Sequence, residues 1–578
     1  MDYMEVYKSW LENPYFDEET KAELKSIEGD EKEIRDRFYA DLEFGTAGLR
    51  GVIGAGINRM NMYTVRKATQ GLANYIISKN GQEKGVAIAF DSRRMSPEFA
   101  DEAACCLAAN GIKAYVFESL RPTPELSFAV RFLGCISGIN ITASHNPPEY
   151  NGYKVYWEDG AQITPPHDAG IMSEVKAVTD YATVKTMSVE EATAAGLYKK
   201  IGAEVDDAYM AELKKNVLHP ECIEQTAKDL KIVYTPLHGT GNLPVRRVLK
   251  ELGFENVFVV PEQELPDGEF PTVSYPNPEA AEAFELALKL AKEKDADLVL
   301  ATDPDADRLG VYAKDSKTGE YVCLTGNMSG SFLADYEIGQ KLAVEGKLPE
   351  DGELIKTIVT TNMVDAIAKH YGVKVTECLT GFKWIGREIL RMETSGKGQY
   401  LFGFEESYGC LIGTHARDKD AIVASMALCE AAAFYKAQGK TIWDGMLEMY
   451  EKYGYYKDNV IAITHKGIEG LEKIKNIMST LRENPPAAFG EYEVLVTRDY
   501  DKDIIKNVKT GEEKPTGIPK SNVLYYELND DAWLAIRPSG TEPKIKLYYG
   551  VVGSDLSDAE AKSETLGKQV SALLDKLG

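Results

Sequence analysis

The chain lacks the cysteine patterns of zinc ribbons, thioredoxin-like sites and disulfide frameworks. Its eight cysteines are scattered over 578 residues, only Cys105 and Cys106 are adjacent, and no Cys-x-x-Cys pair occurs. This spacing excludes zinc-ribbon and thioredoxin-like interpretations. Disulfide frameworks are typical of small secreted domains, and a long chain without one indicates a reducing compartment. We therefore expect a cytoplasmic protein.

A membrane-spanning run and a signal peptide are also missing. The best candidate for a span covers residues 421–435, contains Glu430 and falls short of the ~18 apolar residues that a bilayer requires. The N-terminus, Met1-Asp2-Tyr3-Met4-Glu5-Val6, is acidic, whereas a signal peptide begins with positive charge. We expect no membrane association and predict a buried helix at 421–435.

Positive charge is scarce. Lys and Arg number 66 against 91 Asp and Glu, so the formal net charge is -25. Nucleic-acid binding needs a basic face, and we expect no nucleic-acid partner. An anionic substrate would require cations that are concentrated locally, in loops.

Several catalytic signatures are absent as well. The seven histidines form no His-Glu-x-x-His motif, and no Gly-x-Ser-x-Gly elbow surrounds a serine. Gly439-Lys440-Thr441 resembles the end of a P-loop, but Phe434 replaces its leading glycine. These absences exclude zinc proteases of that type, α/β-hydrolases and P-loop nucleotide binding.

What is present is an alternation of apolar strands and helices. Length alone suggests about three to five domains. Strand-like segments at 86–90, 112–117 and 135–141 alternate with helices, one of which begins at Ser96-Pro97 with the serine as its cap. Two later segments repeat this order, and from about residue 456 the pattern becomes that of antiparallel strands with helices. We predict three related α/β domains with mixed or parallel sheets and a smaller C-terminal α+β domain, with limits at 1–205, 206–322, 323–455 and 456–578.

One candidate site follows the apolar run at 135–141. The residues there are Thr142-Ala143-Ser144-His145-Asn146-Pro147-Pro148, and the prolines end the strand. Ser144 and His145 therefore lie in a loop at the carboxyl end of a strand, where open α/β sheets bind ligands. Ser144 can act as a nucleophile if it is activated; a Ser/Asn/Pro turn without chemistry is the alternative.

Three acids follow a second apolar run. Asp303, Asp305 and Asp307 alternate, and in an extended backbone they would share one face. Such acids repel one another unless a cation lies between them, and Mg²⁺ suits all-oxygen ligation. An EF-hand is excluded because Arg308 occupies the required glycine position. A solvated acidic loop is the alternative.

Three further clusters place polar groups in loops. Lys383 follows Thr380-Gly381 at a helix start, Glu405 and Glu406 end a strand, and Arg537-Pro538-Ser539-Gly540-Thr541 joins two strands. The arginine fork and the hydroxyls of the last cluster suit a dianionic phosphate. One of the two glutamates can face the hydroxyls of a sugar while the other faces solvent. Solvated charges and a plain hairpin turn are the alternatives.

Together these clusters resemble the α-D-phosphohexomutases over nearly the whole chain. The resemblance rests on Gly45-Thr46-Ala47-Gly48-Leu49-Arg50-Gly51, Thr142-Ala143-Ser144-His145-Asn146-Pro147, Asp303-Pro304-Asp305-Ala306-Asp307-Arg308, Glu405-Glu406-Ser407-Tyr408-Gly409 and Arg537-Pro538-Ser539-Gly540-Thr541-Glu542-Pro543. All five in order are very specific. The Glu-Glu-Ser-Tyr-Gly loop and the long first segment look like the phosphoglucomutase branch. Phe404 resembles a subgroup with phosphopentomutase-like members, which leaves a pentose substrate open.

The resemblance implies four domains around one cleft and a role for each motif. Ser144 would carry a phosphoryl group and, with Asp303, Asp305 and Asp307, share one Mg²⁺. Thr380, Gly381, Glu405 and Ser407 would hold sugar hydroxyls. The non-reacting phosphate would lie on Arg537, Ser539, Gly540 and Thr541. The same cleft would be lined by Thr46, Arg50, His145, Lys154, Arg308 and Lys419.

The implied activity is interconversion of α-D-glucose 1-phosphate and glucose 6-phosphate, through a phosphoserine enzyme and glucose 1,6-bisphosphate as activator and intermediate. The expected catalytic residues are Ser144, His145, Arg50 and Lys383, and Lys383, Lys419 or His145 would move the hydroxyl proton. Phosphopentomutase or phosphomannomutase activity is the alternative. A silent sugar-phosphate-binding protein and a phosphatase that uses Ser144 are the rival classes. The expected partner is a small sugar phosphate, and the sequence leaves monomer or dimer open.

Overall fold

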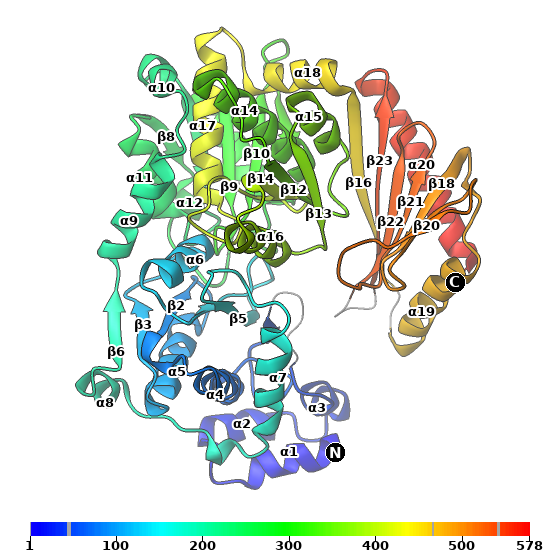
Figure 1. Ribbon diagram of the computed structural model, residues 1–578. Coiled ribbons are helices and arrows are strands. Elements are labelled where there is room, and N and C mark those ends of the chain that lie inside the picture. Colours follow the sequence, from blue (N-terminus) through cyan, green and yellow to red (C-terminus); the bar gives the residue numbers. More distant parts are fainter. Residues whose placement is uncertain (1, 43–47, 465–466, 540–543, 578) are drawn as a thin grey trace. The chain divides into compact units, whose positions relative to one another are not determined.

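The computed structural model describes residues 2–42, 48–464, 467–539 and 544–577. The chain forms two compact units, in which segments distant in sequence come together (Figure 1). Unit 1 contains Met1–Thr325, Phe382–Tyr400 and Ser407–Ile442, and unit 2 contains Gly326–Gly381, Leu401–Glu406 and Trp443–Gly578.

Unit 1 begins with three short helices and a six-stranded mixed sheet in the order β1-β5-β4-β2-β3-β6. The strands are β1 (Leu49–Val52), β2 (Val86–Phe90), β3 (Ala114–Phe117), β4 (Ser137–Ile141), β5 (Tyr150–Trp157) and β6 (Tyr198–Ile201). β4, β2, β3 and β6 are parallel neighbours, whereas β5 pairs antiparallel with β4 and β1. Every residue of β2 and β4 is buried, as expected of strands covered on both faces.

The helices of this part bury apolar stripes on the sheet and on one another. They are α1 (Tyr3–Glu12), α2 (Glu18–Ser26), α3 (Glu31–Phe38), α4 (Met62–Ser78), α5 (Ser96–Ala109), α6 (Thr123–Phe132), α7 (His167–Ala177) and α8 (Val189–Ala194), with 3₁₀ turns η1 (Gln82–Lys84) and η2 (Tyr181–Thr183). The expected serine cap of α5 is wrong. Met95 is the N-cap residue with φ 63°, and the Ser96 hydroxyl donates to Asp91 Oδ1 instead.

The second sheet of unit 1 has the order β11-β10-β9-β7-β8. Its strands are β7 (Lys231–Thr235), β8 (Asn256–Val259), β9 (Leu298–Thr302), β10 (Leu309–Lys314) and β11 (Tyr321–Leu324). The helices are α9 (Ala203–Lys214), α10 (Pro220–Thr226), α11 (Asn242–Glu251), α12 (Pro261–Glu264) and α13 (Glu285–Lys294), with a 3₁₀ turn η3 (Ala281–Phe284). β8, β7 and β9 are parallel, and β10 turns back antiparallel to β9. The loop between β9 and β10 carries the three acids.

Unit 1 also includes α16 (Phe382–Ser395), β15 (Gly409–Leu411) and α17 (Ala421–Ala437). The predicted buried helix at 421–435 is thereby confirmed: α17 is buried from Ala421 through Ala433. Glu430 Oε1 accepts the backbone N–H groups of Leu218 and His219, so this acid is not left in an apolar core without partners. Among the described residues, no helix combines the length and apolar character that crossing a membrane requires.

Unit 2 contains two sheets. The first includes β13 (Lys374–Cys378), β12 (Gly352–Thr357) and β14 (Gln399–Glu405), with the helices α14 (Gly326–Glu345), α15 (Met363–Tyr371) and α18 (Ile442–Tyr453). β12 and β13 are parallel, as a strand–helix–strand unit requires.

The second sheet of unit 2 is antiparallel throughout its described pairings, in the order β16-β23-β22-β21-β18-β19-β20 with β17 paired to β18. The strands are β16 (Tyr455–Thr464), β17 (Ala488–Phe489), β18 (Tyr492–Asp499), β19 (Ile504–Asn507), β20 (Glu513–Lys514), β21 (Leu524–Leu528), β22 (Trp533–Pro538) and β23 (Lys544–Gly553). Two helices, α19 (Gly467–Glu483) and α20 (Leu556–Leu577), contribute to its core. The predicted C-terminal α+β region is confirmed.

Candidate active site

The Ser144 loop joins β4 to β5 and presents one hydroxyl. Ser144 has a left-handed backbone, with φ 51°, a conformation that a non-glycine residue keeps only when its surroundings fix it. Its N–H donates to Thr142 Oγ1 at 2.8 Å, and Asn146 N–H donates to Ala143 O at 3.1 Å. Ser144 Oγ donates to Asp303 Oδ2 at 2.9 Å and lies 3.2 Å from His145 Nδ1. The first two expected clusters therefore meet at this hydroxyl.

The three acids converge in a tight turn, and the extended backbone expected for them is wrong. Ala306 has φ 48°, and its N–H donates to Asp303 O at 2.9 Å. Asp303 Oδ1 accepts the N–H groups of Asp307 and Arg308 at 3.1 and 3.0 Å. Turn geometry, stabilised by the first aspartate, brings the carboxylates together.

The three carboxylates form a candidate cation site. Each offers an oxygen that lies within 4.8 Å of the others, and all three residues are buried. Asp305 Oδ1 and Asp307 Oδ1 are buried and accept no hydrogen bond from the described residues. Buried acceptors normally have partners, and a hard divalent cation such as Mg²⁺ is the partner that this all-oxygen set fits.

Neighbouring cations only partly balance these acids. Lys154 Nζ lies 2.8 Å from Asp305 Oδ2 and 3.7 Å from Asp307 Oδ2, and Lys419 Nζ lies 3.1 Å from Asp307 Oδ2. Burial, together with the charges of Asp305 and Asp307, raises the pKa of Asp303 well above its ordinary value. Burial also opposes ionisation of Asp305, but Lys154 holds its pKa below the ordinary value. A divalent cation would favour the ionised form of all three.

Other positive groups surround the Ser144 hydroxyl. Arg50, on β1, donates from Nη1 to Asn146 Oδ1 at 2.8 Å. Burial and then the charges of Arg308 and Arg50 lower the pKa of His145 well below its ordinary value, so its imidazole is neutral near pH 7. Arg308 pairs with Glu279. The loop region is thus suited to an anion.

Three residues of this cluster were not singled out from the sequence. Thr123, at the start of α6, donates from Oγ1 to Asp305 Oδ2 at 2.9 Å. Asp418 accepts from the Tyr156 hydroxyl at 2.8 Å and lies 3.1 Å from Lys419 Nζ. Thr123 could have been found, because it follows the predicted strand at 112–117, at the same edge of the sheet. Tyr156 lies inside β5, a strand that the sequence analysis did not identify.

Two more expected residues belong to unit 1 without a described contact to the acids. Lys383 lies in the first turn of α16, and burial lowers the pKa of its ammonium group. Its Nζ lies 5.8 Å from the centre of the Trp384 ring. Ser407 is half-buried in the turn after β14. Their expected roles stay predictions.

Within unit 2, the structure brings three of the expected sugar-loop residues together. Glu405 Oε1 accepts the N–H of Gly381 at 2.7 Å, which ties β14 to the turn that contains Thr380. Glu405 is buried. Glu406 Oε2 accepts from the hydroxyls of Thr357 and Thr360 at 3.3 and 3.4 Å. The two adjacent acids therefore have different partners.

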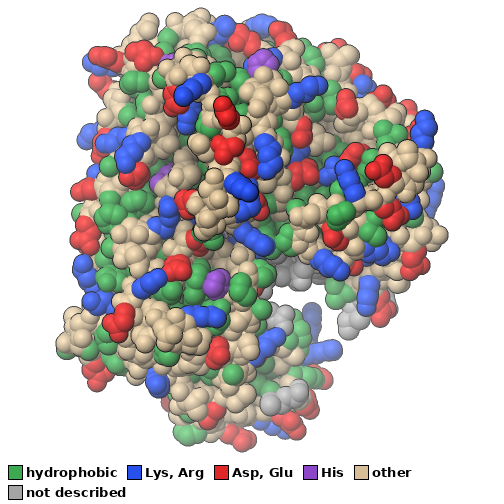
Figure 2. All heavy atoms as spheres, viewed as in Figure 1, with side chains coloured by type: hydrophobic (Ala, Val, Ile, Leu, Met, Phe, Trp, Pro, Cys, Tyr) green, Lys and Arg blue, Asp and Glu red, His purple; other side chains and the backbone are tan. Residues whose placement is uncertain are grey.

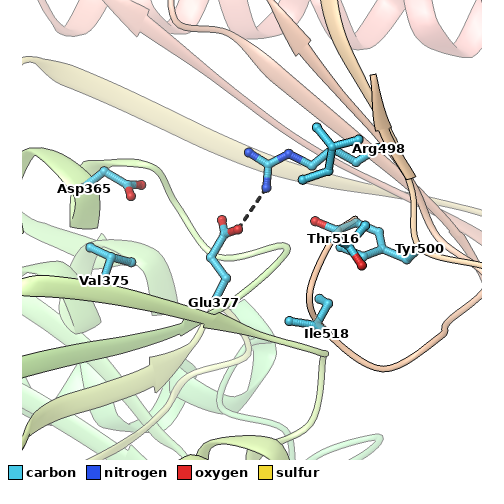
Figure 3. Close-up of a pocket in the computed structure, with 8 residues that line it drawn as sticks. Asp365, Val375, Glu377, Arg498, Tyr500, Thr516 and Ile518 are labelled. Atoms are coloured by element: carbon cyan, nitrogen blue, oxygen red, sulfur yellow. Dashed lines mark hydrogen bonds and ion pairs between the residues drawn. The ribbon is translucent and has the colours of Figure 1, made fainter. Parts of the chain in front are cut away.

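The expected phosphate loop is only partly described. Arg537 is half-buried in β22 opposite Lys546, and Ser539 N–H donates to Lys544 O at 2.7 Å. Thr46, Gly540 and Thr541 lie outside the described residues. A pocket of about 380 Å³ in unit 2 is lined by other residues, among them Glu377, Arg498 and Tyr500 (Figure 3). On the face seen in Figure 2, Lys and Arg side chains are interspersed with Asp and Glu.

Comparison with known sequence families gives three matches in chain order. Residues 41–182, 207–318 and 325–453 match the families described as "Phosphoglucomutase/phosphomannomutase, alpha/beta/alpha" domains I, II and III. A phosphoglucomutase of Staphylococcus epidermidis is 36% identical over 537 residues, which cover 91% of this chain and 95% of that protein. One of Staphylococcus saprophyticus is 36% identical over 558 residues, or 96% and 98% of the two chains.

Solved structures share the fold. Parafusin, a phosphoglucomutase of Paramecium, aligns with a TM-score of 0.67 at 18% identity, over 93% of this chain and 96% of its own. A phosphoglucomutase/phosphomannomutase family protein of Burkholderia thailandensis aligns with a TM-score of 0.62 at 20% identity, over 91% and 97%. The long matches at 36% identity and the three consecutive domain families agree. The chain therefore belongs to the α-D-phosphohexomutase family, in its phosphoglucomutase branch.

Proposed function

We propose that the protein is a phosphoglucomutase that interconverts α-D-glucose 1-phosphate and glucose 6-phosphate through a phosphoserine at Ser144. The observation that carries this proposal is the 2.9 Å hydrogen bond from Ser144 Oγ to Asp303, one of three buried acids that together suit a divalent cation. The 36% identity to proteins named phosphoglucomutase supports glucose as the sugar.

The reaction transfers one phosphoryl group out and another back. The 6-hydroxyl of glucose 1-phosphate attacks the phosphorus on Ser144, the bond from phosphorus to Ser144 Oγ breaks, and glucose 1,6-bisphosphate forms. After the bisphosphate turns over, Ser144 Oγ attacks the 1-phosphate, the bond from that phosphorus to the O1 oxygen breaks, and glucose 6-phosphate leaves. Because the bisphosphate can also transfer a phosphoryl group to an unphosphorylated Ser144, with a glucose monophosphate leaving, glucose 1,6-bisphosphate is both intermediate and activator in this proposal.

In phosphoryl transfer, the protein contributes mainly by neutralising the negative charge of the transferring group. Asp303, Asp305 and Asp307, with a phosphorylated Ser144, would hold one Mg²⁺ per chain. When bound, that ion supplies Lewis-acid stabilisation of charge on phosphoryl oxygens. Arg50, hydrogen-bonded to the Ser144 loop, supplies a fixed positive charge. Lys383, Lys419 or His145 would move the hydroxyl proton, and the lowered pKa of Lys383 and His145 favours their neutral, proton-accepting forms.

The remaining expected residues are proposed to bind substrate. Thr380, Gly381, Glu405 and Ser407 would contact sugar hydroxyls, and Arg537, Ser539, Gly540 and Thr541 would hold the non-reacting phosphate. The other proposed substrate contacts are Thr46, Lys154, Arg308 and Lys419. The ammonium groups of Lys154 and Lys419 already contact the acids. In this proposal they would also contact the phosphoryl group, whose charge a metal ion held by the acids would help to neutralise.

We also propose the domain limits and the cellular location of the protein. The domain limits at 1–205, 206–322 and 323–455 enclose the three family matches, which supports them, and 456–578 would be the fourth domain. All eight cysteines are described without a disulfide, which supports a cytoplasmic location. Monomer and dimer are both compatible with this proposal.

The decisive experiment compares glucose 1-phosphate, mannose 1-phosphate and ribose 1-phosphate by kcat/KM. We expect glucose 1-phosphate to be preferred; a clear preference for ribose or mannose 1-phosphate would make the protein a phosphopentomutase or a phosphomannomutase.

Ser144→Ala tests the mechanism. We expect loss of mutase activity and loss of the single phosphate that intact-mass measurement detects on the wild-type protein. Near-normal activity of the variant would contradict the phosphoserine. Stoichiometric release of inorganic phosphate would indicate a phosphatase, and a wild-type protein that binds sugar phosphate without turnover would be a silent binding protein.

A further inference from the structure

One buried guanidinium outside the expected site contacts the Ser144 loop along its length. Arg93 lies just after β2, and its side chain is 0% exposed. Its Nη2 donates to Ser144 O at 2.6 Å and to Asn146 O, and its Nη1 donates to Pro147 O at 2.8 Å and Tyr150 O at 3.1 Å. Three carbonyls of the loop, and that of Tyr150 at the start of β5, thus accept hydrogen bonds from one side chain.

Arg93 is itself held in place from behind. Its Nε lies 3.3 Å from Asp91 Oδ2, and its backbone N–H donates to Asp91 Oδ1 at 2.9 Å. The Ser96 hydroxyl donates to the same Oδ1 at 2.8 Å. The guanidinium carbon lies 5.0 Å from the centre of the Phe270 ring. The side chain therefore has a fixed position rather than a choice of solvated rotamers.

The contacts require the shape of a guanidinium. Its planar fork presents five donors in fixed directions, whereas a lysine ammonium presents three donors at one point and cannot reach four carbonyls spread from Ser144 to Tyr150. Without these donors, the carbonyls of Ser144 and Asn146 would lose hydrogen bonds. The left-handed backbone of Ser144 is one of the features that the contacts maintain, because its carbonyl is among the four acceptors.

We propose that Arg93 is a positioning residue for phosphoryl transfer at Ser144. It holds the loop so that Ser144 Oγ points at Asp303, and its permanent charge behind the loop offsets the charge of a phosphoryl group on that oxygen. The charge acts within a few ångströms of Ser144 and in a buried setting, where electrostatic interactions are strong. This inference rests on the proposed mutase function.

The first test replaces the fork and keeps the charge, in Arg93→Lys. We expect kcat to fall about 100-fold, as for a misplaced reacting group, while KM stays within about threefold, because no substrate contact is assigned to Arg93. The rate at which glucose 1,6-bisphosphate phosphorylates Ser144, followed by intact mass, should fall in parallel. A residue that only supports folding would lower Tm and the fraction of active protein, but not kcat per folded molecule.

The matched control is Arg94→Lys. Arg94 also donates to this loop, to Pro148 O at 3.3 Å, but its side chain is 49% exposed and pairs with Glu269. We expect kcat of this variant within about twofold of wild type, because exposed ion pairs contribute little. A kcat for folded Arg93→Lys as high as that for Arg94→Lys would overturn the proposal.

Chemical rescue covers the case in which Arg93→Lys does not fold. Arg93→Ala leaves a cavity shaped like a guanidinium, and we expect added guanidinium to restore kcat in a saturable way. Urea, which is planar and has similar donors but no charge, should restore less. Restored Tm without restored kcat, equal rescue by urea, or no rescue of folded protein would each contradict the proposal.

Wild-type mutase activity is measured beside every variant. An inactive wild-type protein would refute the proposed function, whereas an active wild type with an equally active Arg93→Lys would refute only the role of Arg93.

Discussion

Ser144 Oγ and Asp303 Oδ2 lie 2.9 Å apart although 159 positions separate the two residues in the sequence. Each residue follows a fully buried parallel strand, β4 or β9, of a different sheet in unit 1. Each also lies in a loop shaped by a left-handed residue, Ser144 itself or Ala306. The contact therefore depends on two turns as well as on two strands, and it places a nucleophilic hydroxyl at the edge of a candidate metal site.

Asp305→Asn tests that metal site. The substitution replaces a charged carboxylate with a neutral amide, which is a weaker ligand for Mg²⁺. We therefore expect the apparent affinity for Mg²⁺ to fall by at least about 10–100-fold, the loss that follows a change in the groups that support metal ligands, and kcat at limiting Mg²⁺ to fall with it. The measurement is activity as a function of Mg²⁺ concentration. Asp315→Asn is the control, because Asp315 is a half-buried acid in the turn between β10 and β11, where its carboxylate accepts only from Lys317 and Thr318 among the described residues. An unchanged Mg²⁺ requirement in Asp305→Asn would contradict the assignment.

Tyr156→Phe tests the support of Lys419. The buried Tyr156 hydroxyl donates to Asp418 Oδ2, and Asp418 Oδ1 lies 3.1 Å from Lys419 Nζ. Losing the hydroxyl leaves a buried carboxylate oxygen without its donor, which should cost about 1–3 kcal/mol of stability. We also expect a lower kcat, since Lys419 would lose a fixed anchor beside Asp307.

Urea unfolding and steady-state kinetics measure these two effects. Tyr39→Phe is the control for the tyrosine-to-phenylalanine change, because Tyr39 is 62% exposed, and it should alter neither stability nor kcat. Equal behaviour of the two variants would show that the hydrogen bond to Asp418 does not support the site.

The sequence was sufficient to predict several of the segments that form the candidate site. A buried strand in an α/β sheet is an apolar run, and the polar residues that follow it must lie at its carboxyl end. Ser144 and Asp303, which follow the fully buried β4 and β9, are of this kind. Strands of the C-terminal sheet such as β21 and β22 were predictable because they are short runs rich in aromatic and apolar residues.

The details that depend on backbone turns were not predictable. The clustering of Asp303, Asp305 and Asp307 was anticipated from strand alternation, but it results from a turn at Ala306. The left-handed φ of this residue could not be predicted, because alanine rarely adopts that conformation. The sequence places Arg93 directly after a predicted strand, but it does not predict the partners of its side chain. Those partners are backbone carbonyls, which any residue type supplies. β5 was missed because its polar residues, such as Lys154, are buried beside the acids of another sheet.

Arg498 and Glu377 provide a test of stability within unit 2. Arg498 Nη1 donates to Glu377 Oε2 at 2.9 Å across the pocket of Figure 3. Burial opposes ionisation of Glu377, but the charges of Lys356 and Arg498 hold its pKa below the ordinary value. Arg498→Gln and Glu377→Gln should each lower the free energy of unfolding by about 1–3 kcal/mol, and the double variant by less than the sum.

The exposed pair Lys506–Glu513 is the matched control for this cycle. Its nitrogen–oxygen distance is 2.9 Å, equal to that of the Arg498–Glu377 bond, but its side chains are 48% and 50% exposed. We expect a coupling energy below about 0.5 kcal/mol there. Urea unfolding of the single and double variants gives both coupling energies, and equal values would show that burial adds nothing to the Arg498 pair.

Asp458 predicts a pH dependence of stability. This residue lies in β16, and burial raises the pKa of its carboxyl group from 3.8 to about 6. Its Oδ1 is buried and accepts no hydrogen bond from the described residues. Between pH 4 and 6 the folded protein therefore binds more protons at this site than the unfolded chain, so its contribution to the free energy of unfolding falls as the pH rises.

Asp458→Asn removes this titration. At pH 8 we expect the variant to be more stable than wild type by up to about 3 kcal/mol, the difference between the two pKa values expressed as energy, and at pH 4 the two proteins should be similar. Urea unfolding at several pH values measures the difference. Asp531→Asn, at an exposed position before β22, should follow wild type throughout. Parallel curves for wild type and Asp458→Asn from pH 4 to 8 would show that Asp458 is ionised in the folded protein at no cost, because its carboxylate has acquired solvent or a hydrogen-bond donor.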